Sequence, residues 1–417
     1  MIPRRTFLTL SGLSFAATGF VRRLLAQEAP QTQEKIENLV AGVKPLERDD
    51  YAARAEKARR LLSDNNMDGL FLIGGTDMLY FTGLNMWVSE RLSGVVLNRK
   101  RSPIWVIPAF ELEREKERIP TGDEIRTWEE HESPYAVVAG IMRDLGAPGG
   151  RLALGPAVRS FMFFRLRQDA ERLELVDGLP VTQGCRAVKS EKEIAFMDLA
   201  NKITKHAYRE AFSQLREGMR PEELDGAIEA AHKQIGVDGG SGAQFAQSTA
   251  FPHGSKVERT LRPGDVIMVD GGCAVEGYHA DVTRTIVFGE PKPAQRALWE
   301  IVRRAQVAAL RAARPGVPCD QVDAAARKVI DDAGYGPGYK HFAHRLGHGI
   351  GLDGHEYPYL VKGNLLKLEP GMTFSDEPGI YTYGEYGVRI EDCFVVTEDG
   401  GRVLGGMEAT AMDRPFE

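Results

Sequence analysis

Two acidic residues, Asp270 and Asp281, lie in a segment whose pattern is otherwise that of a β-hairpin. The flanking residues are apolar or β-branched, and Val275, Glu276 and Gly277 are short and polar enough to turn the chain. A turn centred between Val275 and Glu276 would place the two aspartates directly opposite each other, with their side chains about 5 Å apart on one face. Two like charges at that distance repel, so a shared proton or a cation has to stabilise them.

A second segment, GMTFSDEPGIYTYGEYGVRIEDCFVVT, repeats this arrangement, because Glu377 and Glu391 are equidistant from Gly384. Either pair alone could be an exposed pair of acids, or a pair held by an arginine such as Arg284 or Arg389. Two such pairs in one half of the chain favour another explanation, because burying four carboxylates without cations costs many kcal/mol. We therefore predict divalent metal between the two hairpins.

Histidines gather in a third segment, HFAHRLGHGIGLDGHE, which contains His344, His348 and His355 among four glycines. His253 lies in a separate PHG sequence. A lone histidine is usually a polar core residue, but three within twelve positions, in a chain whose carboxylates already predict metal, favour a functional role. Glycine also lets backbone and imidazole approach a site closely.

Four carboxylates and one imidazole form a hard, oxygen-rich set of ligands. Such a set suits Mn²⁺, Fe²⁺ or Co²⁺ better than a thiolate zinc site does, and bridging carboxylates favour two ions about 3.5–4 Å apart. Paired ions lower the pKa of a bridging water and polarise a carbonyl, so the predicted reaction class is metal-assisted hydrolysis. The residues alone leave a phosphate ester and an amide open as substrates.

Composition excludes several other classes of protein. A net charge of -6 over 417 residues gives no basic surface for nucleic acid. The four cysteines are far apart and form no C-x-x-C pair, which excludes a zinc ribbon and does not favour a disulfide framework. We expect four buried thiols instead.

The first thirty residues are typical of an export signal. Arg4 and Arg5 precede a short apolar run, and the order Arg-Arg-x-Phe-Leu resembles a twin-arginine signal. We expect residues 1–30 to direct export to the periplasm. An uncleaved membrane anchor is the alternative, because the cleavage site near Ala26 is weak.

The rest of the chain divides into two parts. In residues 31–183, strand patterns such as PIWVIP and LELVDGL alternate with helical patterns, which predicts an α/β N-terminal domain. In residues 184–417, pairs of helices alternate with the acid-bearing hairpins, which predicts an α+β domain. Its first helix should begin after Ser190, a favourable N-cap residue followed by acids in the first turn.

Four motifs in this order, VDGG…HADVTRT, GHGIGLDGHE, EPGIY and GVRIEDCFVVTEDG, resemble those of the pita-bread metallopeptidases. That family includes Xaa-Pro dipeptidase (prolidase), aminopeptidase P and methionine aminopeptidase. The stretch MDGLFLIGGTDMLYFTGL also resembles the start of the N-terminal domain of creatinase and the proline-specific members, which methionine aminopeptidases usually lack. The resemblance implies an α+β pita-bread catalytic domain from about Val181, preceded by a smaller α/β domain of the creatinase/prolidase type.

The resemblance also implies the metal ligands. They would be Asp270, Asp281, His348, Glu377 and Glu391. Asp281 and Glu391 would bridge two divalent ions, for which we expect Mn²⁺ before Co²⁺, Fe²⁺ or Zn²⁺. Glu377 would also act as the acid and base that handles the proton of a metal-bridging water or hydroxide.

Further residues of the pocket follow from the same resemblance. His253 and His355 would hold the substrate and stabilise the tetrahedral intermediate, and His344 would line the same pocket. Arg389 would orient Glu391 or bind a substrate carboxylate.

By this resemblance we expect a homodimeric peptidase that cleaves the bond between a residue and a following proline, as a dipeptidase or an aminopeptidase. A dipeptidase has to bind a free carboxylate, for which Arg389, Lys362 and Lys367 are candidates. A hydrolase of another small amide and a metal-free binding protein of the same fold are the alternatives. The five intact ligand positions argue against the binding protein.

Two further residues carry specific expectations. Asp376 departs from the apolar or small residue that relatives commonly have beside Glu377, and strand alternation predicts that its side chain points into solvent. Trp87 is expected in the core, with a contact to a neighbouring subunit's active site as the alternative.

Overall fold

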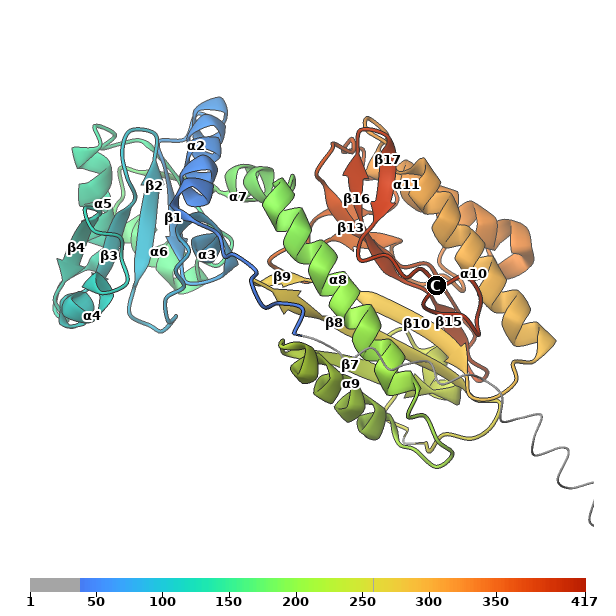
Figure 1. Ribbon diagram of the computed structural model, residues 1–417. Coiled ribbons are helices and arrows are strands. Elements are labelled where there is room, and N and C mark those ends of the chain that lie inside the picture. The colour runs from blue at the N-terminus through green and yellow to red at the C-terminus, as the bar shows by residue number, and fades with distance from the viewer. Residues whose placement is uncertain (1–37, 258) are drawn as a thin grey trace, which may run out of the picture.

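The computed structural model describes residues 38–257 and 259–417 (Figure 1). Two bodies are visible, one drawn in blue to teal and the other in green to red. The predicted export signal at residues 1–30 lies outside the described residues. In the part of the chain that is described, no helix combines the length and the apolar character needed to cross a bilayer.

A mixed sheet forms the centre of the N-terminal body. Its strands are β1 (Gly69–Ile73), β2 (Gly94–Asn98), β3 (Ile104–Pro108), β4 (Glu124–Trp128), β5 (Arg151–Leu154) and β6 (Glu174–Asp177). They lie in the order β4-β3-β2-β1-β5-β6. β2 is antiparallel to both of its neighbours, whereas β1, β5 and β6 run parallel, as do β3 and β4. Parallel pairs need crossover connections, and these are the predicted helices.

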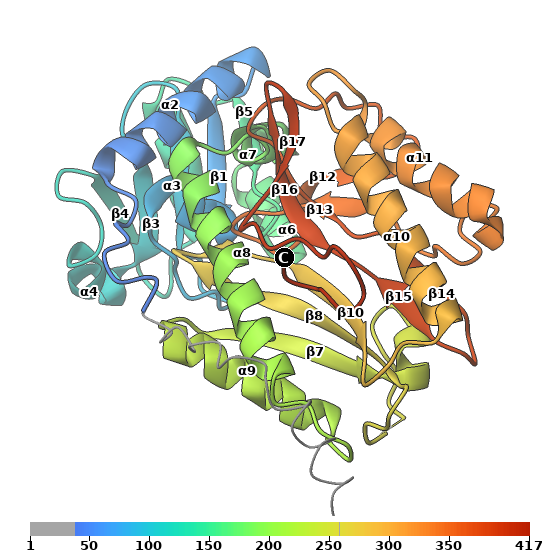
Figure 2. The ribbon, with the colours of Figure 1, turned by 45° about the vertical axis from the view of Figure 1, so that its right-hand side comes forward.

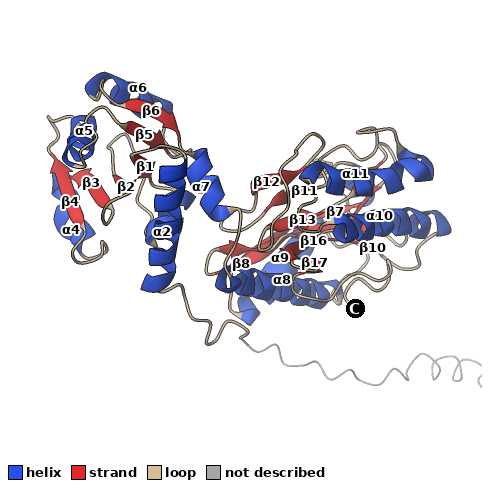
Figure 3. Cartoon of the chain, turned by 90° about the horizontal axis from the view of Figure 1, so that it is seen from above, coloured by secondary structure: helices blue, strands red, loops and turns tan. Residues whose placement is uncertain are grey.

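Helices cover both faces of this sheet (Figure 3). They are α2 (Arg48–Asp64), α3 (Thr76–Thr82), η1 (Ala109–Glu111), α4 (Leu112–Lys116), α5 (Pro134–Asp144), α6 (Ser160–Asp169) and α7 (Leu179–Arg186). Alternate residues of β1 belong to two separate hydrophobic clusters, one on each face of the sheet. Leu70 packs with residues of α2, α3 and α7, and Phe71 packs with residues of α5 and α6. All five β1 residues are therefore buried, which confirms the predicted α/β architecture.

The second body contains two pairs of long helices. They are α8 (Glu191–Phe212) with α9 (Pro221–Ile235), and α10 (Pro293–Ala312) with α11 (Cys319–Ile330), to which the short η2 (Ala246–Ala250) and η3 (Asp331–Tyr335) are added. Ser190 is the N-cap of α8, as predicted. Its side chain accepts from the Glu193 backbone N–H, and the Glu193 carboxylate accepts from the Ser190 backbone N–H. This capping box satisfies two backbone donors that the first helical turn leaves unpaired.

The strands of the second body form three sheets. They are β7 (Gly239–Phe245), β8 (Val266–Val275), β9 (Tyr278–His279), β10 (Val282–Val287), β11 (Gly347–Gly349), β12 (Glu356–Leu360), β13 (Thr373–Asp376), β14 (Gly379–Tyr381), β15 (Gly387–Arg389), β16 (Asp392–Thr397) and β17 (Gly400–Val403). One sheet has the order β10-β8-β7 with β9 on β8, another has the order β12-β11-β13-β16-β17, and β14 pairs with β15. Figure 2 shows α8 and α9 beside β7 and β8, and α10 and α11 beside the other large sheet. This arrangement confirms the α+β class.

The register of the first hairpin differs from the prediction. Val275 pairs with Tyr278, so the turn consists of Glu276 and Gly277, with φ of 50° and 81°. Two residues with positive φ make the tight turn that matches the twist of a hairpin. The centre of the hairpin therefore lies one residue later than predicted, and Asp270 pairs with Thr283 rather than with Asp281.

The register of the second hairpin is confirmed. β14 and β15 pair Gly379 with Arg389, and β13 and β16 pair Asp376 with Asp392. Both pairings are symmetric about Gly384, as predicted for Glu377 and Glu391.

Asp376 does not point into solvent, contrary to the prediction. The residue is 2% exposed, because α10 covers the face of β13 that alternation assigned to solvent. The Gln306 side chain donates from Nε2 to the backbone oxygen of Asp376 at 3.2 Å and to the Asp392 carboxylate at 3.3 Å. Burial raises the pKa of Asp376 well above its usual value, and the charge of Asp392 adds to the rise.

Trp87 does not lie in the core, contrary to the prediction. Its side chain is 88% exposed in the connection between α3 and β2. The expectation for the cysteines is confirmed, since all four lie within the described residues and each is a buried free thiol.

Candidate metal centre

The predicted ligands come together at the meeting point of the two large sheets. Asp270 lies in β8 and Asp281 just before β10, while His348 lies in β11. Glu377 follows β13 and Glu391 precedes β16. The Glu391 backbone N–H donates to the Thr283 oxygen at 3.1 Å, which joins one sheet to the other at this point.

Among the described residues, three overlapping groups have donor atoms within 4.8 Å of one another. They are Asp281 with His348 and His355, His348 with Glu377 and Glu391, and Asp270 with Asp281 and Glu391. Glu391 belongs to one group with His348 and to another with Asp270, and Asp281 also reaches both sides. This overlap is the arrangement that two cations sharing bridging carboxylates require.

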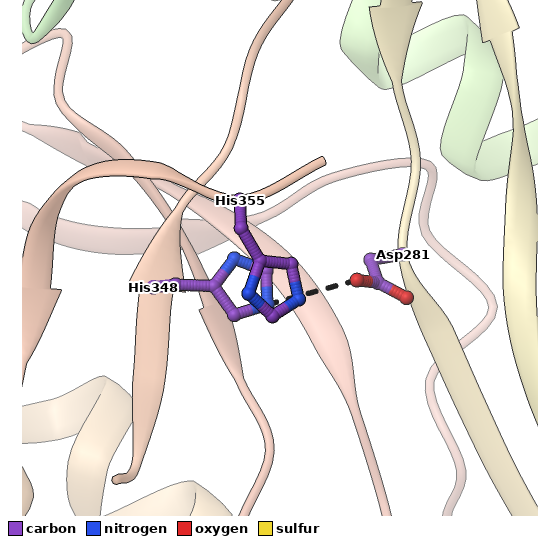
Figure 4. A group of neighbouring side chains, drawn as sticks. All are labelled: Asp281, His348 and His355. Atoms are coloured by element: carbon purple, nitrogen blue, oxygen red, sulfur yellow. Dashed lines mark ion pairs between the residues drawn. The ribbon is translucent and has the colours of Figure 1, made fainter. Parts of the chain in front are cut away.

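His348 is prepared to act as a ligand through Nε2. Its Nδ1 lies 3.1 Å from the Gly349 oxygen and can donate to it, which leaves a lone pair on Nε2. That Nε2 lies 3.4 Å from Glu377 Oε1 and 3.7 Å from Asp281 Oδ2. Figure 4 shows the Asp281 carboxylate directed toward the imidazole. Burial and the neighbouring His355 lower the pKa of His348 to about 3, so the ring is neutral, as a metal ligand has to be.

Most of the carboxylates are held close together against their own repulsion. Burial raises the pKa of Asp281 well above its usual value, and the charges of Asp270 and Glu377 raise it further. Burial and the charges of Asp281 and Asp270 raise the pKa of Glu391 in the same way, and burial and Glu391 raise that of Glu377. Divalent cations would remove this repulsion, so the residues present fit a metal centre with two ions.

Arg389 contacts Asp270, the one of the four candidate-ligand carboxylates whose pKa is lowered. Its Nη2 lies 2.8 Å from Asp270 Oδ2, and its Nε lies 3.8 Å from Glu391 Oε2. Burial opposes ionisation of Asp270, but the Arg389 charge, the hydrogen bonds to Thr283 and Glu391 and the charge of His253 together outweigh burial and hold the pKa of the carboxyl below its usual value. Arg389 is 3% exposed and also donates to the Pro252 oxygen at 2.8 Å and to the Tyr381 hydroxyl at 3.1 Å.

Thr283 is a residue of the site that the sequence analysis missed. Its hydroxyl oxygen lies 2.7 Å from Asp270 Oδ1 and 2.6 Å from Glu391 Oε2, and it accepts from Arg389 Nε at 2.9 Å. The correct hairpin register would have found it, because Thr283 is the residue opposite Asp270.

Replacing Thr283 with valine should weaken metal binding about 10- to 100-fold while preserving the fold, because groups that orient metal ligands contribute on this order to affinity. The affinity is measured by competition with a chelating dye. A matched control is Thr373→Val, which removes a hydroxyl that is equally buried but donates to the Ile350 oxygen. Equal affinities in the two variants would contradict a role of Thr283 in orienting the ligands.

The other predicted pocket residues lie around this centre. His344 lies between the Arg345 oxygen, 2.8 Å from Nδ1, and the Tyr381 hydroxyl, 2.8 Å from Nε2. Its Nδ1 is also 3.8 Å from Glu377 Oε2. Burial and the charge of Arg389 lower the pKa of His344 to about 3. The ring is therefore a neutral group beside Glu377. Tyr381, whose hydroxyl links His344 to Arg389, is a further residue of the site that was not predicted.

His355 and His253 are the exposed histidines of the predicted set. The His355 ring stacks on His348 with 3.5 Å between ring centroids, and its Nδ1 lies 3.2 Å from Arg345 Nη2 (Figure 4). His253 lies in a turn directly after Pro252, whose oxygen accepts from Arg389. Both histidines are therefore placed where a molecule entering from solvent can reach them.

Comparisons with known proteins agree with this geometry. Residues 195–398 match the metallopeptidase family M24, and residues 54–188 match the creatinase/prolidase N-terminal domain. An Xaa-Pro dipeptidase of Lactobacillus helveticus is 34% identical over 351 residues, which cover 83% of this chain and 94% of that protein. A probable dipeptidase, PepE, of Mycobacterium tuberculosis is 36% identical over 369 residues, which cover 86% of this chain and 95% of that protein.

A solved structure gives the same result for the fold. The crystal structure of dipeptidase PepE from Mycobacterium ulcerans matches with a TM-score of 0.81 and 34% identity, covering 87% of this chain and 97% of that one. The fold and the cluster of acidic and histidine donors define a metallopeptidase of the pita-bread type. The chain belongs to metallopeptidase family M24, with an N-terminal domain of the creatinase/prolidase type.

Proposed function

We propose that this metallopeptidase hydrolyses the bond between an N-terminal residue and proline, with two divalent cations at the candidate centre. The observation that carries the proposal is the overlap of the donor groups, in which Glu391 is shared between Asp270 on one side and His348 on the other. The preference for proline is inferred from the Xaa-Pro dipeptidase that the chain resembles over most of its length. Proline has no amide N–H and restricts the residue before it, so its peptide bond needs a dedicated pocket.

The chain's own residues have separate parts in this proposal. When bound, the cations lower the pKa of water and polarise the scissile carbonyl. Glu377 takes the proton of the attacking water and later passes it to the leaving nitrogen. Glu377 Oε1 lies 3.4 Å from His348 Nε2, so this carboxylate faces the candidate centre where the proton has to be taken up. The Ser375 hydroxyl, 3.3 Å from Glu377 Oε1, orients this carboxylate.

The exposed histidines would bind the substrate. We propose that His355 and His253 donate hydrogen bonds to the oxygen on which charge develops during attack. His344, neutral and fixed by Tyr381, would line the pocket beside Glu377. Arg389 orients Asp270 and Glu391 in this proposal. Because its guanidinium is already paired with Asp270, a carboxylate of the substrate would need another cation.

We propose dipeptidase activity over aminopeptidase activity, because the relatives compared above carry dipeptidase names. The test measures hydrolysis of Gly-Pro and of Gly-Pro-Ala after loading with Mn²⁺, and again after chelation. We expect cleavage of the dipeptide alone and its loss with chelator. Release of only the first residue from the tripeptide would identify an aminopeptidase instead. Two bound metals without turnover of either peptide would contradict the proline preference.

We propose Mn²⁺ as the native metal, because a ligand set of four carboxylates and one imidazole is hard and oxygen-rich. Elemental analysis of protein purified without added metal tests this assignment. Zinc or iron as the dominant ion would contradict it.

We also propose that the protein acts as an exported homodimer. The twin-arginine pattern at Arg4 and Arg5 supports export to the periplasm, either with cleavage of the signal or with its retention as an anchor. Fractionation of cells that produce the wild type and an Arg4→Lys, Arg5→Lys variant tests the export. The homodimer is inferred from the family resemblance, and light scattering of the wild type and of the Trp87→Ala variant tests whether the exposed Trp87 contacts a second copy.

A further inference from the structure

A cluster of ion pairs connects the N-terminal domain to the segment that carries His355. Arg186, the last residue of α7, donates from Nη1 to Asp77 Oδ1 at 2.9 Å. From Nη2 it donates to Asp353 Oδ2 at 2.6 Å and to Glu356 Oε2 at 2.5 Å. Asp77 belongs to α3 of the N-terminal domain, whereas Asp353 and Glu356 flank His355 in the catalytic domain. The Arg186 guanidinium therefore joins α3 of the N-terminal domain to the segment of the catalytic domain that carries His355.

Two further contacts strengthen the same connection. The hydroxyl of Thr76, at the start of α3, donates to Asp353 Oδ1 at 2.6 Å. Lys189 Nζ lies 2.7 Å from Glu356 Oε1. The segment that contains His355 is thus held by one cation from α7, one cation that follows α7, and one hydroxyl from the N-terminal domain.

Burial makes this cluster strong and directional. The side chains of Arg186, Asp77 and Glu356 are 11%, 8% and 7% exposed, so water and salt screen them little, whereas the Asp353 side chain is 41% exposed and its pair with Arg186 is screened more. The planar guanidinium fixes the direction of each hydrogen bond, which a lysine would not do. Loss of Arg186 would leave Glu356 with Lys189, Asp353 with the Thr76 hydroxyl, and Asp77 without the cation that it contacts.

The His355 ring has few other restraints. It is exposed, and beside its place near the Asp281 carboxylate it has the stack on His348 and the approach of Arg345. A cavity of about 260 Å³, also lined by Asp77 and Arg186, lies against it, so that side of the ring is not packed. The position of the ring therefore depends on the backbone of residues 353–356.

We propose that Arg186 and Asp77 are positioning residues, which hold the segment 353–356 so that His355 meets the substrate beside the metal centre. Through them the N-terminal domain becomes a part of the active site although it supplies no ligand to the three donor groups of the described chain. The inference rests on the proposed function, because that function gives His355 its contact with substrate.

The first test is a double-mutant cycle in the Mn²⁺-loaded full-length protein with Gly-Pro as substrate. Arg186→Gln should lower kcat/KM about 10- to 100-fold, since small displacements of a positioned group have effects of this order. In the His355→Ala background the same change should lower kcat/KM less than twofold, because the residue it positions is gone. Equal losses in both backgrounds would overturn the proposal, since a general stabilising role predicts that result.

Hydrogen exchange of the metal-loaded protein gives a readout that does not need turnover. Asp77→Asn removes one of three acceptor charges and should preserve the fold even where Arg186→Gln does not. We expect amides of residues 351–356 to exchange about tenfold faster in this variant. Unchanged exchange in this segment would overturn the proposal. Faster exchange in a protein that does not cleave Gly-Pro would support the linkage while rejecting the proposed function.

A matched control exists in the same domain interface. Arg54 of α2 donates to Glu193 of α8 at 2.8 Å, and the two side chains are 7% and 5% exposed. Glu193→Gln breaks an equally buried ion pair between the same domains, but neither residue contacts segment 353–356. It should leave kcat/KM and the exchange of residues 351–356 unchanged. A loss equal to that of Asp77→Asn would mean that any weakening of the interface suffices, and would overturn the specific role.

Discussion

Replacing Glu391 with glutamine should reduce the metal content from two ions per chain to one or none, and lower kcat on the order of 10³-fold. Glu391 belongs both to the donor group with His348 and to the donor group with Asp270, and it is 2% exposed. Glutamine keeps the size of the side chain but offers one oxygen and no charge. Elemental analysis after dialysis measures the metal content, and steady-state kinetics with Gly-Pro measures kcat.

Glu385→Gln is the matched control for this substitution. Glu385 lies in the same hairpin but is exposed, so its replacement should change neither metal content nor kcat. Two ions per chain together with an unchanged kcat in the Glu391 variant would show that Glu391 is not a ligand.

The metal-free protein should become less stable as pH rises above about 6.5, the pKa of an unfolded histidine. Burial and mutual repulsion raise the pKa of Asp281, Glu377 and Glu391 in the folded chain. The folded state then retains protons that the unfolded chain has released, so the free energy of unfolding falls with pH. Each retained proton contributes a slope of about 1.4 kcal/mol per pH unit.

The histidines set the lower limit of the pH range in which the free energy of unfolding falls. The pKa values of His344 and His348 are lowered to about 3 in the folded chain. Between that value and about 6.5 the unfolded chain binds more protons at these residues, so their contribution raises stability with pH and opposes that of the carboxylates. Above about 6.5 the histidines lose their charge in the unfolded chain as well, so the carboxylate contribution dominates. Toward pH 8.5 the four buried cysteines add to the decline, because burial raises their pKa values in the folded chain while unfolded thiols begin to ionise.

Urea unfolding at pH 6.5, 7.5 and 8.5 in the presence of a chelator measures this slope. Asp281→Asn should give a shallower slope, because one proton is removed and the repulsion on Glu391 is reduced. Loading with Mn²⁺ should abolish the decline, since cations replace the retained protons. A free energy of unfolding that is constant over this range in the chelated wild type would contradict the electrostatic account.

Much of this site could be predicted from the sequence, because acidic hairpins obey simple geometry. The symmetric placement of Glu377 and Glu391 about Gly384 was sufficient, since both strand pairings keep that symmetry. The first hairpin differed because the tight turn requires positive φ at its second residue, which Gly277 provides. A Gly at the second position of a two-residue turn was the signal that would have corrected the register and found Thr283.

Other features could not be predicted from local pattern. Strand alternation places the Asp376 side chain in solvent only if that face of the sheet meets solvent, and here α10 covers it. Trp87 has the residue type of a core position, but its exposure is decided by how a connection is placed. The bond from Arg186 to Glu356 spans 170 positions of sequence and depends on how two domains dock, about which local periodicity carries no information.

The backbone bond from Glu391 to Thr283 has a consequence for how the protein is made. These residues are 108 positions apart, and the bond exists only when the last large sheet has formed against the earlier one. Contacts between residues so far apart in sequence form slowly, because the chain loses the entropy of closing a long loop before these contacts can stabilise it. A growing chain that ends before residue 377 lacks two of the five candidate ligands, Glu377 and Glu391. We therefore expect the proposed centre to bind cations only late in biosynthesis, after both sheets have been assembled.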